Sequence, residues 1–265
     1  MTDAPTGIDG SGTARARCVL APNPSPLTLD GTNTWVIAEP GSTAVLVVDP
    51  GPSDEGHLRR VLSVARAGDR RVAQIVLTHG HPDHAAGAAR FAELSGAPVG
   101  ALDPALRLGS DGIAAGSVIT AAGCAVRVVG TPGHSADSLS LLLEADGALL
   151  TGDTVLGRGT TVIAGDGSLG DYLRTLDELR SLADAAALRV LLPGHGPLLD
   201  DPAGVLDYYI AHRRRALRAP GQAARDDARC SSQGHRPRSS RSCTRTPTWP
   251  SAAPRSGQSA PSWTT

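Results

Sequence analysis

Six consecutive residues place four potential metal ligands in one short segment. The segment is His79-Gly80-His81-Pro82-Asp83-His84, which carries three imidazoles and one carboxylate. Neutral imidazole and carboxylate are side chains that zinc and similar divalent ions bind. Two metal ions need more donors than four side chains supply, because catalytic metals also keep a position for water. The segment therefore predicts part of a two-metal site whose remaining ligands lie elsewhere in the chain.

Three further candidate ligands follow apolar runs later in the sequence. They are His134 in Thr131-Pro132-Gly133-His134, Asp153 in Leu150-Thr151-Gly152-Asp153, and His195 in Pro193-Gly194-His195-Gly196. The preceding runs, 126–129, 139–150 and 190–192, are typical of strands. A ligand at the end of a strand is held by a rigid scaffold, and the glycine lets the backbone approach closely. Five of the eight histidines in the chain occupy these positions, which scattered surface histidines would not explain.

The order of these residues resembles the ligand pattern of the metallo-β-lactamase superfamily, His-x-His-x-Asp-His followed by His, Asp and His. The resemblance implies an α/β (α+β) fold, a four-layer αββα sandwich with the metals at one edge between two sheets. It also implies two divalent ions, with zinc favoured over iron or manganese. By this resemblance one ion takes His79, His81 and His134, the other takes Asp83, His84 and His195, and Asp153 bridges them.

Strands and helices alternate in two halves of the chain, as expected for a layered architecture. We expect strands over 34–38, 44–48 and 73–77, with a hairpin turn at 39–42. We expect helices around 58–65, over 85–94 and from 169 onward, the last with Ser168 as its N-cap. Residues 165–170 match Gly-x-Gly-x-x-Gly but lack a surrounding βαβ unit. A loop that enters a helix is therefore favoured over a dinucleotide site.

Other residues beside the ligands have candidate supporting or catalytic roles. Asp49 ends an apolar run and is placed to hold a ligand imidazole, since ligating histidines usually donate their free N–H to a carboxylate or carbonyl. A turn residue before Pro50 is the equal alternative for Asp49. The segment around Ser135 lacks the second glycine of a nucleophile elbow, so Ser135 is disfavoured as a nucleophile. It is instead expected to support His134. Asp83 is a candidate to orient or deprotonate the attacking water, with Asp153 bridging the metals.

Composition divides the chain into one domain and two termini. At 265 residues and 40% hydrophobic content the chain can bury a full core. We expect a flexible N-terminus over 1–17, the domain over 18–218, and a disordered tail over 219–265, because aliphatic residues cease after Leu217. Seven arginines against two aspartates give that tail a net charge of +5, while the chain carries −1. Its composition favours a frameshifted C-terminus over an evolved nucleic-acid-binding arm.

The remaining global features concern thiols and membranes. Cys18, Cys124, Cys230 and Cys243 show no metal-type spacing, so we expect unpaired thiols, with a disulfide as the minority alternative. The sequence has no apolar run near 18 residues and no secretory signal at its start. These features predict a cytoplasmic protein without a membrane partner.

Three other segments resemble one branch of the superfamily, the β-lactamase-like protein 2 branch, which includes endoribonucleases acting on single-stranded RNA. These segments are 31–35, 152–162 and 208–213, and the resemblance runs from about residue 18 to residue 215. It predicts hydrolysis of RNA phosphodiesters by water that two metals activate as hydroxide. His212 and Arg213 are then candidates to contact a substrate phosphate, and a solvated helix face is the alternative.

Other substrates remain open, because fold and metals set the reaction class while the pocket walls set the substrate. The main alternative is hydrolysis of a small-molecule thioester, by resemblance to hydroxyacylglutathione hydrolase. A β-lactamase is less favoured, since zinc β-lactamases are generally secreted and lack the bridging aspartate. A non-catalytic nucleic-acid-binding protein is disfavoured by the seven filled ligand positions.

Overall fold

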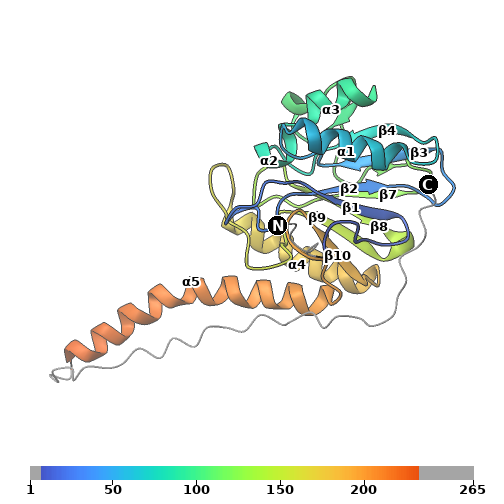
Figure 1. Ribbon diagram of the computed structural model, residues 1–265. Coiled ribbons are helices and arrows are strands. Elements are labelled where there is room, and N and C mark those ends of the chain that lie inside the picture. The colour runs from blue at the N-terminus through green and yellow to red at the C-terminus, as the bar shows by residue number, and fades with distance from the viewer. Residues whose placement is uncertain (1–6, 233–265) are drawn as a thin grey trace.

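Two five-stranded sheets lie face to face, and helices cover the outer face of each (Figure 1). The computed structural model describes residues 7–232, with side chains described up to residue 217. One sheet has the order β1-β2-β3-β4-β5 and the other has the order β10-β9-β8-β7-β6. Each sheet is therefore built mainly from one half of the chain. This arrangement confirms the expected αββα sandwich.

The first sheet combines an antiparallel hairpin with parallel strands. Its strands are β1 (Ala16–Leu20), β2 (Asn33–Ile37), β3 (Ala44–Val48), β4 (Arg71–Val76) and β5 (Val99–Gly100). β2 and β3 pair antiparallel across the expected turn, whereas β4 and β5 run parallel to β3. The crossover to β4 is α1 (Glu55–Arg66), whose N-cap Asp54 accepts a hydrogen bond from the backbone N–H of His57.

The second sheet contains more strands than the sequence predicts. Its strands are β6 (Val118–Ile119), β7 (Val126–Gly130), β8 (Leu139–Leu143), β9 (Ala148–Gly152) and β10 (Val190–Pro193). The run 139–150, expected as one strand, is a hairpin, so that prediction is wrong. The chain turns through the 3-10 helix η2 (Glu144–Asp146) and then Gly147, whose φ of 56° is in the left-handed region.

Four further helices and one 3-10 turn complete the layers. They are α2 (Pro82–Ala85), α3 (Ala88–Ser95), η1 (Pro104–Leu106), α4 (Leu169–Ala185) and α5 (Pro202–Ser232). The single helix expected over 85–94 is instead split between α2 and α3 at Gly87. Ser168 caps α4 as predicted, because its side chain accepts a hydrogen bond from the N–H of Asp171, and residues 165–168 form the loop that enters the helix.

Apolar side chains form three layers that match this architecture. The inner layer lies between the sheets, where Trp35 and Leu46 pack in the same cluster as Leu141 and Leu150. A second cluster joins the first sheet to α1 and α3, and the third joins the second sheet to α4 and α5. Figure 1 shows α1 and α3 on one side of the sandwich and α4 with the start of α5 on the other. The edge of the sheets is thus held rigidly from both sides.

The structure describes part of each segment that flanks the expected domain. Within the N-terminal segment expected to be flexible, residues 7–17 are packed: Ile8 is buried, and Arg15 bonds Glu39 and Asp146. At the other end α5 continues through Ser232. The rest of the predicted tail, 233–265, lies outside the described residues. One buried isoleucine and a few polar contacts hold the N-terminal segment, and composition gives no sign of such contacts.

Two expectations about thiols and membranes can be compared with the described part of the chain. Cys18 and Cys124 are both unpaired and buried, as predicted. Cys243 lies outside the described residues, as does the side chain of Cys230. Among residues 7–232, none of the helices is long and apolar enough to cross a bilayer.

Candidate metal centre

All seven candidate ligands from the sequence meet at one edge of the sandwich. The segment 79–84 follows β4 and runs into α2, while the other ligands lie after β7, β9 and β10. Three overlapping groups of donor atoms result, each with all atoms within 4.8 Å of one another: His79, His81 and His134; His79, His84 and Asp153; and Asp83, His84 and His195. The carboxyl ends of strands from both sheets therefore build the centre.

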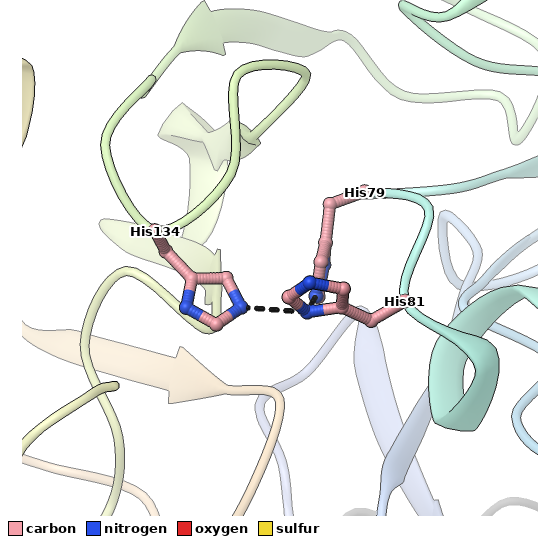
Figure 2. Close-up of side chains that lie close together, drawn as sticks. All are labelled: His79, His81 and His134. Atoms are coloured by element: carbon pink, nitrogen blue, oxygen red, sulfur yellow. Dashed lines mark hydrogen bonds between the residues drawn. The ribbon is translucent and has the colours of Figure 1, made fainter. Parts of the chain in front are cut away.

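The first group consists of three imidazoles that point toward one another from two loops (Figure 2). His79 and His81 come from the segment 79–84, and His134 comes from the loop after β7. Nδ1 of His81 lies 3.0 Å from Nε2 of His79 and 2.9 Å from Nε2 of His134. His79 is almost fully buried and His134 is 7% exposed. Burial lowers the pKa of both His79 and His134, which favours the neutral imidazole that binds metals.

The other donors surround His84 on the opposite side of the centre. Nε2 of His84 lies 3.2 Å from Nε2 of His195, and Oδ2 of Asp83 lies 3.1 Å from the same His195 nitrogen. Asp153 stands between the two sides: its carboxylate oxygens lie 3.3 Å from both His84 and His195, and 3.8 Å from His134. Asp153 is therefore within reach of both imidazole groups, which suits a bridging ligand.

On this side of the centre, Asp153 and the neighbouring imidazoles shift one another's pKa values. Burial alone would raise the pKa of Asp153, but His84 and His195 hold it well below its usual range. Burial alone would lower the pKa of His84, but Asp153 and Asp49 raise it well above 6.5. The pKa of His195 rises to about 9 against the same desolvation, mainly because of Asp153. Positive charge beside Asp153 thus stabilises its buried carboxylate, and a divalent ion would supply the same stabilisation.

The donor geometry fits a metal ion as well. Tetrahedral zinc with bonds of about 2.0–2.1 Å places two ligand nitrogens about 3.4 Å apart. The facing ring nitrogens here are 2.9–3.2 Å apart, so a shift of a few tenths of an ångström would accommodate the ion. Oδ1 of Asp153 is buried and has no hydrogen-bond partner. A buried carboxylate oxygen without a donor is costly unless a cation satisfies it.

Contacts outside the centre orient four of its five imidazoles, and side chains hold two of these rings. His84 donates from Nδ1 to Oδ2 of Asp49 at 2.9 Å, and Asp49 in turn accepts hydrogen bonds from the backbone and hydroxyl of Thr78, both at 2.7 Å. The Thr78 hydroxyl also lies 3.0 Å from Nδ1 of His79. The structure therefore places Asp49 against a ligand, in addition to its position in the turn, where its φ is 51°.

Backbone carbonyl groups orient the other two rings. Nδ1 of His134 donates to the carbonyl oxygen of Val162 at 2.7 Å, and Nδ1 of His195 donates to that of Gly31 at 3.1 Å. The Thr161 hydroxyl lies 3.2 Å from the same His134 nitrogen. In all four rings Nδ1 faces outward and Nε2 faces the centre. Sequence reasoning missed these partners, because any residue type carries a backbone carbonyl.

The loop that carries His195 is fixed by residues of β2. The Asn33 side chain donates to the carbonyl oxygens of Pro193 and Gly196, both at 2.9 Å, and the Trp35 indole donates to that of Pro193. Gly194 lies in this loop, close to the side chains of Asp153 and His84. A Cβ at that position would lie 2.5 Å from Oδ1 of Asp153, so only glycine fits. Asn33 lies in a segment that the sequence singled out only by resemblance.

The other predicted site residues lie farther from the metal ligands. Ser135 hydrogen-bonds Asp137 and Ser138, which steadies the turn after His134 without a contact to its ring. His212 stacks on Tyr208, with 6.0 Å between ring centroids. Arg213 donates to the carbonyl oxygen of Thr161 and lies over the Tyr172 ring. Neither His212 nor Arg213 is among the residues that line the cavity described next.

A cavity of about 600 Å³ opens onto the ligands. Its floor includes His81, Asp83, His134, Asp153 and His195. Apolar side chains form much of its wall: Pro26, Leu27, Leu29, Leu156, Val162 and Ala164. Arg158 is the one arginine among the described lining residues, and its guanidinium is paired with Asp30 at 2.6 Å. The site therefore offers an apolar wall beside a strongly polar floor.

The chain is similar to several known proteins. Residues 27–195 match the model of the family described as "Metallo-beta-lactamase superfamily". A Beta-lactamase-like protein 2 homolog of Caenorhabditis elegans is 32% identical over 76% of this chain and 68% of its own length. An atrochrysone carboxyl ACP thioesterase of Aspergillus fumigatus is 34% identical over 76% of this chain and 62% of its own length. A metallo-beta-lactamase family protein from Thermus thermophilus shares the fold, with a TM-score of 0.65, 22% identity, and coverage of 77% of this chain and 81% of that one.

Proposed function

Because the chain belongs to the metallo-β-lactamase superfamily, whose members are generally hydrolases, we propose that this hydrolase cleaves thioesters of apolar acyl groups and depends on two divalent ions, zinc above others. The observation that carries the substrate class is the cavity wall. Leu27 and Val162 both line the cavity, yet 68% and 53% of their surfaces are exposed. Exposed aliphatic side chains from two separate segments beside an active site favour an apolar substrate group.

Different residues would contribute to different steps of hydrolysis. Metals at this centre would supply Lewis acidity and lower the pKa of water. Four imidazoles held through Nδ1 keep the donor atoms aimed at the centre, so little reorganisation is needed during the reaction. Asp83 lines the cavity beside His195 and is positioned to take a proton from the attacking water. Water adds to the thioester carbonyl and the C–S bond breaks. The products are the carboxylic acid and a thiolate, which takes up a proton to become the thiol.

Similarity supports this choice without deciding it. The relative named as a thioesterase is as similar as the relative named as a Beta-lactamase-like protein 2 homolog, at 34% and 32% identity. Each alignment spans roughly two thirds of the relative's own length.

Cleavage of single-stranded RNA, the first expectation from the sequence, is the second candidate. RNA-binding grooves usually combine unpaired basic residues with aromatic stacking surfaces. Among the described lining residues, Arg158 is the sole arginine, and Asp30 already neutralises it. The walls therefore favour an acyl group over a phosphodiester chain.

The experiment compares substrates and wall variants in the zinc-loaded protein. We expect hydrolysis of an octanoyl thioester of N-acetylcysteamine and little cleavage of an end-labelled RNA oligonucleotide. Val162→Ser should raise KM for the octanoyl thioester about tenfold and change that for the acetyl thioester much less. Val118→Ser is the matched control, because Val118 is also 53% exposed but lies on β6 outside the cavity lining. Metal-dependent RNA cleavage without thioester hydrolysis would establish the second candidate instead.

A further inference from the structure

The loop over residues 154–162 links the cavity wall to one of the metal ligands. It begins after β9, contains Gly157 and Gly159, and has no helix or strand between 154 and 162. At its far end the carbonyl oxygen of Val162 and the hydroxyl of Thr161 both face Nδ1 of His134. The orientation of the His134 ring therefore depends on a segment that has no regular backbone hydrogen bonding of its own.

Two tyrosines from the outer helices hold the first part of this loop. The Tyr172 hydroxyl, on α4, donates to the carbonyl oxygen of Thr154 at 2.7 Å. The Tyr209 hydroxyl, on α5, accepts from the N–H of Leu156 at 3.0 Å and lies 3.1 Å from the carbonyl oxygen of Gly159. Both rings are fully buried. Their hydroxyl groups thus satisfy backbone groups that would otherwise be buried without partners.

Arg213 holds the last part of the loop. It lies four residues after Tyr209 and so on the same face of α5. Its Nη2 donates to the carbonyl oxygen of Thr161, one residue before the Val162 carbonyl that binds His134. Its guanidinium carbon lies 5.2 Å from the centroid of the Tyr172 ring. The three side chains therefore form one connected set across α4, α5 and the loop.

We propose that Tyr172, Tyr209 and Arg213 form a clamp that positions His134 for metal binding through loop 154–162. This inference rests on the metal dependence of the proposed function but not on its substrate. It gives Arg213 a positioning role in place of the candidate phosphate contact, since its guanidinium contacts the Thr161 carbonyl and the Tyr172 ring. It also gives α5 a role in supporting the metal centre through the loop.

Substitutions in the full chain test the clamp with a readout other than activity. Arg213→Met keeps the long side chain but removes the donors, and Tyr209→Phe removes only a hydroxyl. Arg214→Met is the matched control, because Arg214 is the next residue on α5, is half exposed, and pairs with Asp177 at the surface. Zinc affinity is measured by competition with a chromogenic chelator, and the visible spectrum of the cobalt-substituted protein reports the ligand geometry.

We expect Arg213→Met to weaken the affinity of one of the two ions by about 10- to 100-fold and to alter the cobalt spectrum. Tyr209→Phe should shift both in the same direction by a smaller factor, Arg213→Lys should partly restore them, and Arg214→Met should leave both unchanged. Wild-type affinity and spectrum in Arg213→Met and Tyr209→Phe, even with a lower melting temperature, would overturn the clamp. Failure of the wild-type protein to bind metal would instead overturn the proposed function.

Discussion

The carboxylate of Asp49 accepts a hydrogen bond from Nδ1 of His84 at 2.9 Å, so the opposite nitrogen of that ring faces Asp153 and His195. Asp49 reaches this position from a left-handed backbone conformation at the end of β3, with φ at 51°. Such a strained backbone persists only where the surroundings enforce it. Here two further hydrogen bonds from Thr78 hold the carboxylate in place.

Asp49→Asn should weaken metal binding by about 10- to 100-fold, because an amide is a poorer acceptor for the His84 N–H than a carboxylate. Chelator competition measures the change. Asp69→Asn is the control, since Asp69 has a similar φ of 58° but is exposed and precedes β4, at the opposite end of that strand from the ligand segment. Equal affinities in the two variants would show that Asp49 is only a turn residue.

Zinc should stabilise the folded protein, because the complete donor groups exist only after folding. At free zinc one hundred times the dissociation constant, each site contributes about 2.7 kcal/mol. For a domain of this size that corresponds to a rise of roughly 5–10 °C in melting temperature per site. Calorimetry with and without chelator measures the shift, and metal analysis should give two equivalents. A single equivalent at saturation would contradict the two-ion assignment.

Asp153→Ala should reduce turnover at least about a hundredfold while the fold persists. Its carboxylate is within reach of both imidazole groups, whereas the core between the sheets does not include it. Steady-state kinetics at saturating zinc, with circular dichroism as the folding control, measure the effect. Unchanged turnover with metal content retained would remove Asp153 from the reaction.

His57 should make stability depend on pH below neutrality. It is 2% exposed, and burial lowers its pKa to about 4 from an unfolded value near 6.5. Between these values the unfolded state binds more protons, so stability is fully present above pH 6.5 and is lost as pH falls toward 4. Arg60 lowers this pKa further, while Asp54 and Asp9 raise it in part.

Urea unfolding at pH 7.5 and pH 5, at fixed zinc concentration, tests this prediction. The wild-type protein should lose about 2 kcal/mol more than His57→Gln over that interval, because the variant lacks this titration. The remaining histidines are common to both proteins and cancel in the comparison. Equal losses in the two proteins would mean that His57 titrates normally.

The sequence predicted which residues gather at the candidate metal centre better than it predicted the elements between them. Each candidate ligand is a rare side chain at or just beyond the end of an apolar run, so residue type and spacing suffice to find it. By contrast the run 139–150 hides a hairpin, because η2 and Gly147 interrupt it with only four residues. The long helix α5 is also hidden, because its later residues lack the apolar periodicity on which the prediction depends.

The contacts that orient the ligands were the least predictable part. Asp49 was one of two equal alternatives, a support for a ligand or a turn residue, because a carboxylate follows an apolar run there. The carbonyl oxygens of Gly31 and Val162 carry no signal in the sequence, since their role depends on where the loop places them. Tyr172 and Tyr209 read as ordinary core residues of amphipathic helices, and only the fold shows that their hydroxyl groups face loop 154–162.

Each of the three donor groups takes two side chains from the segment 79–84 and one from a later part of the chain: His134, Asp153 or His195. When the protein is synthesised, the first half of the chain supplies only two donors to each group. Tight metal capture must therefore wait until the second sheet has docked. A metal ion bound by a complete group would therefore stabilise the docked arrangement of the two sheets.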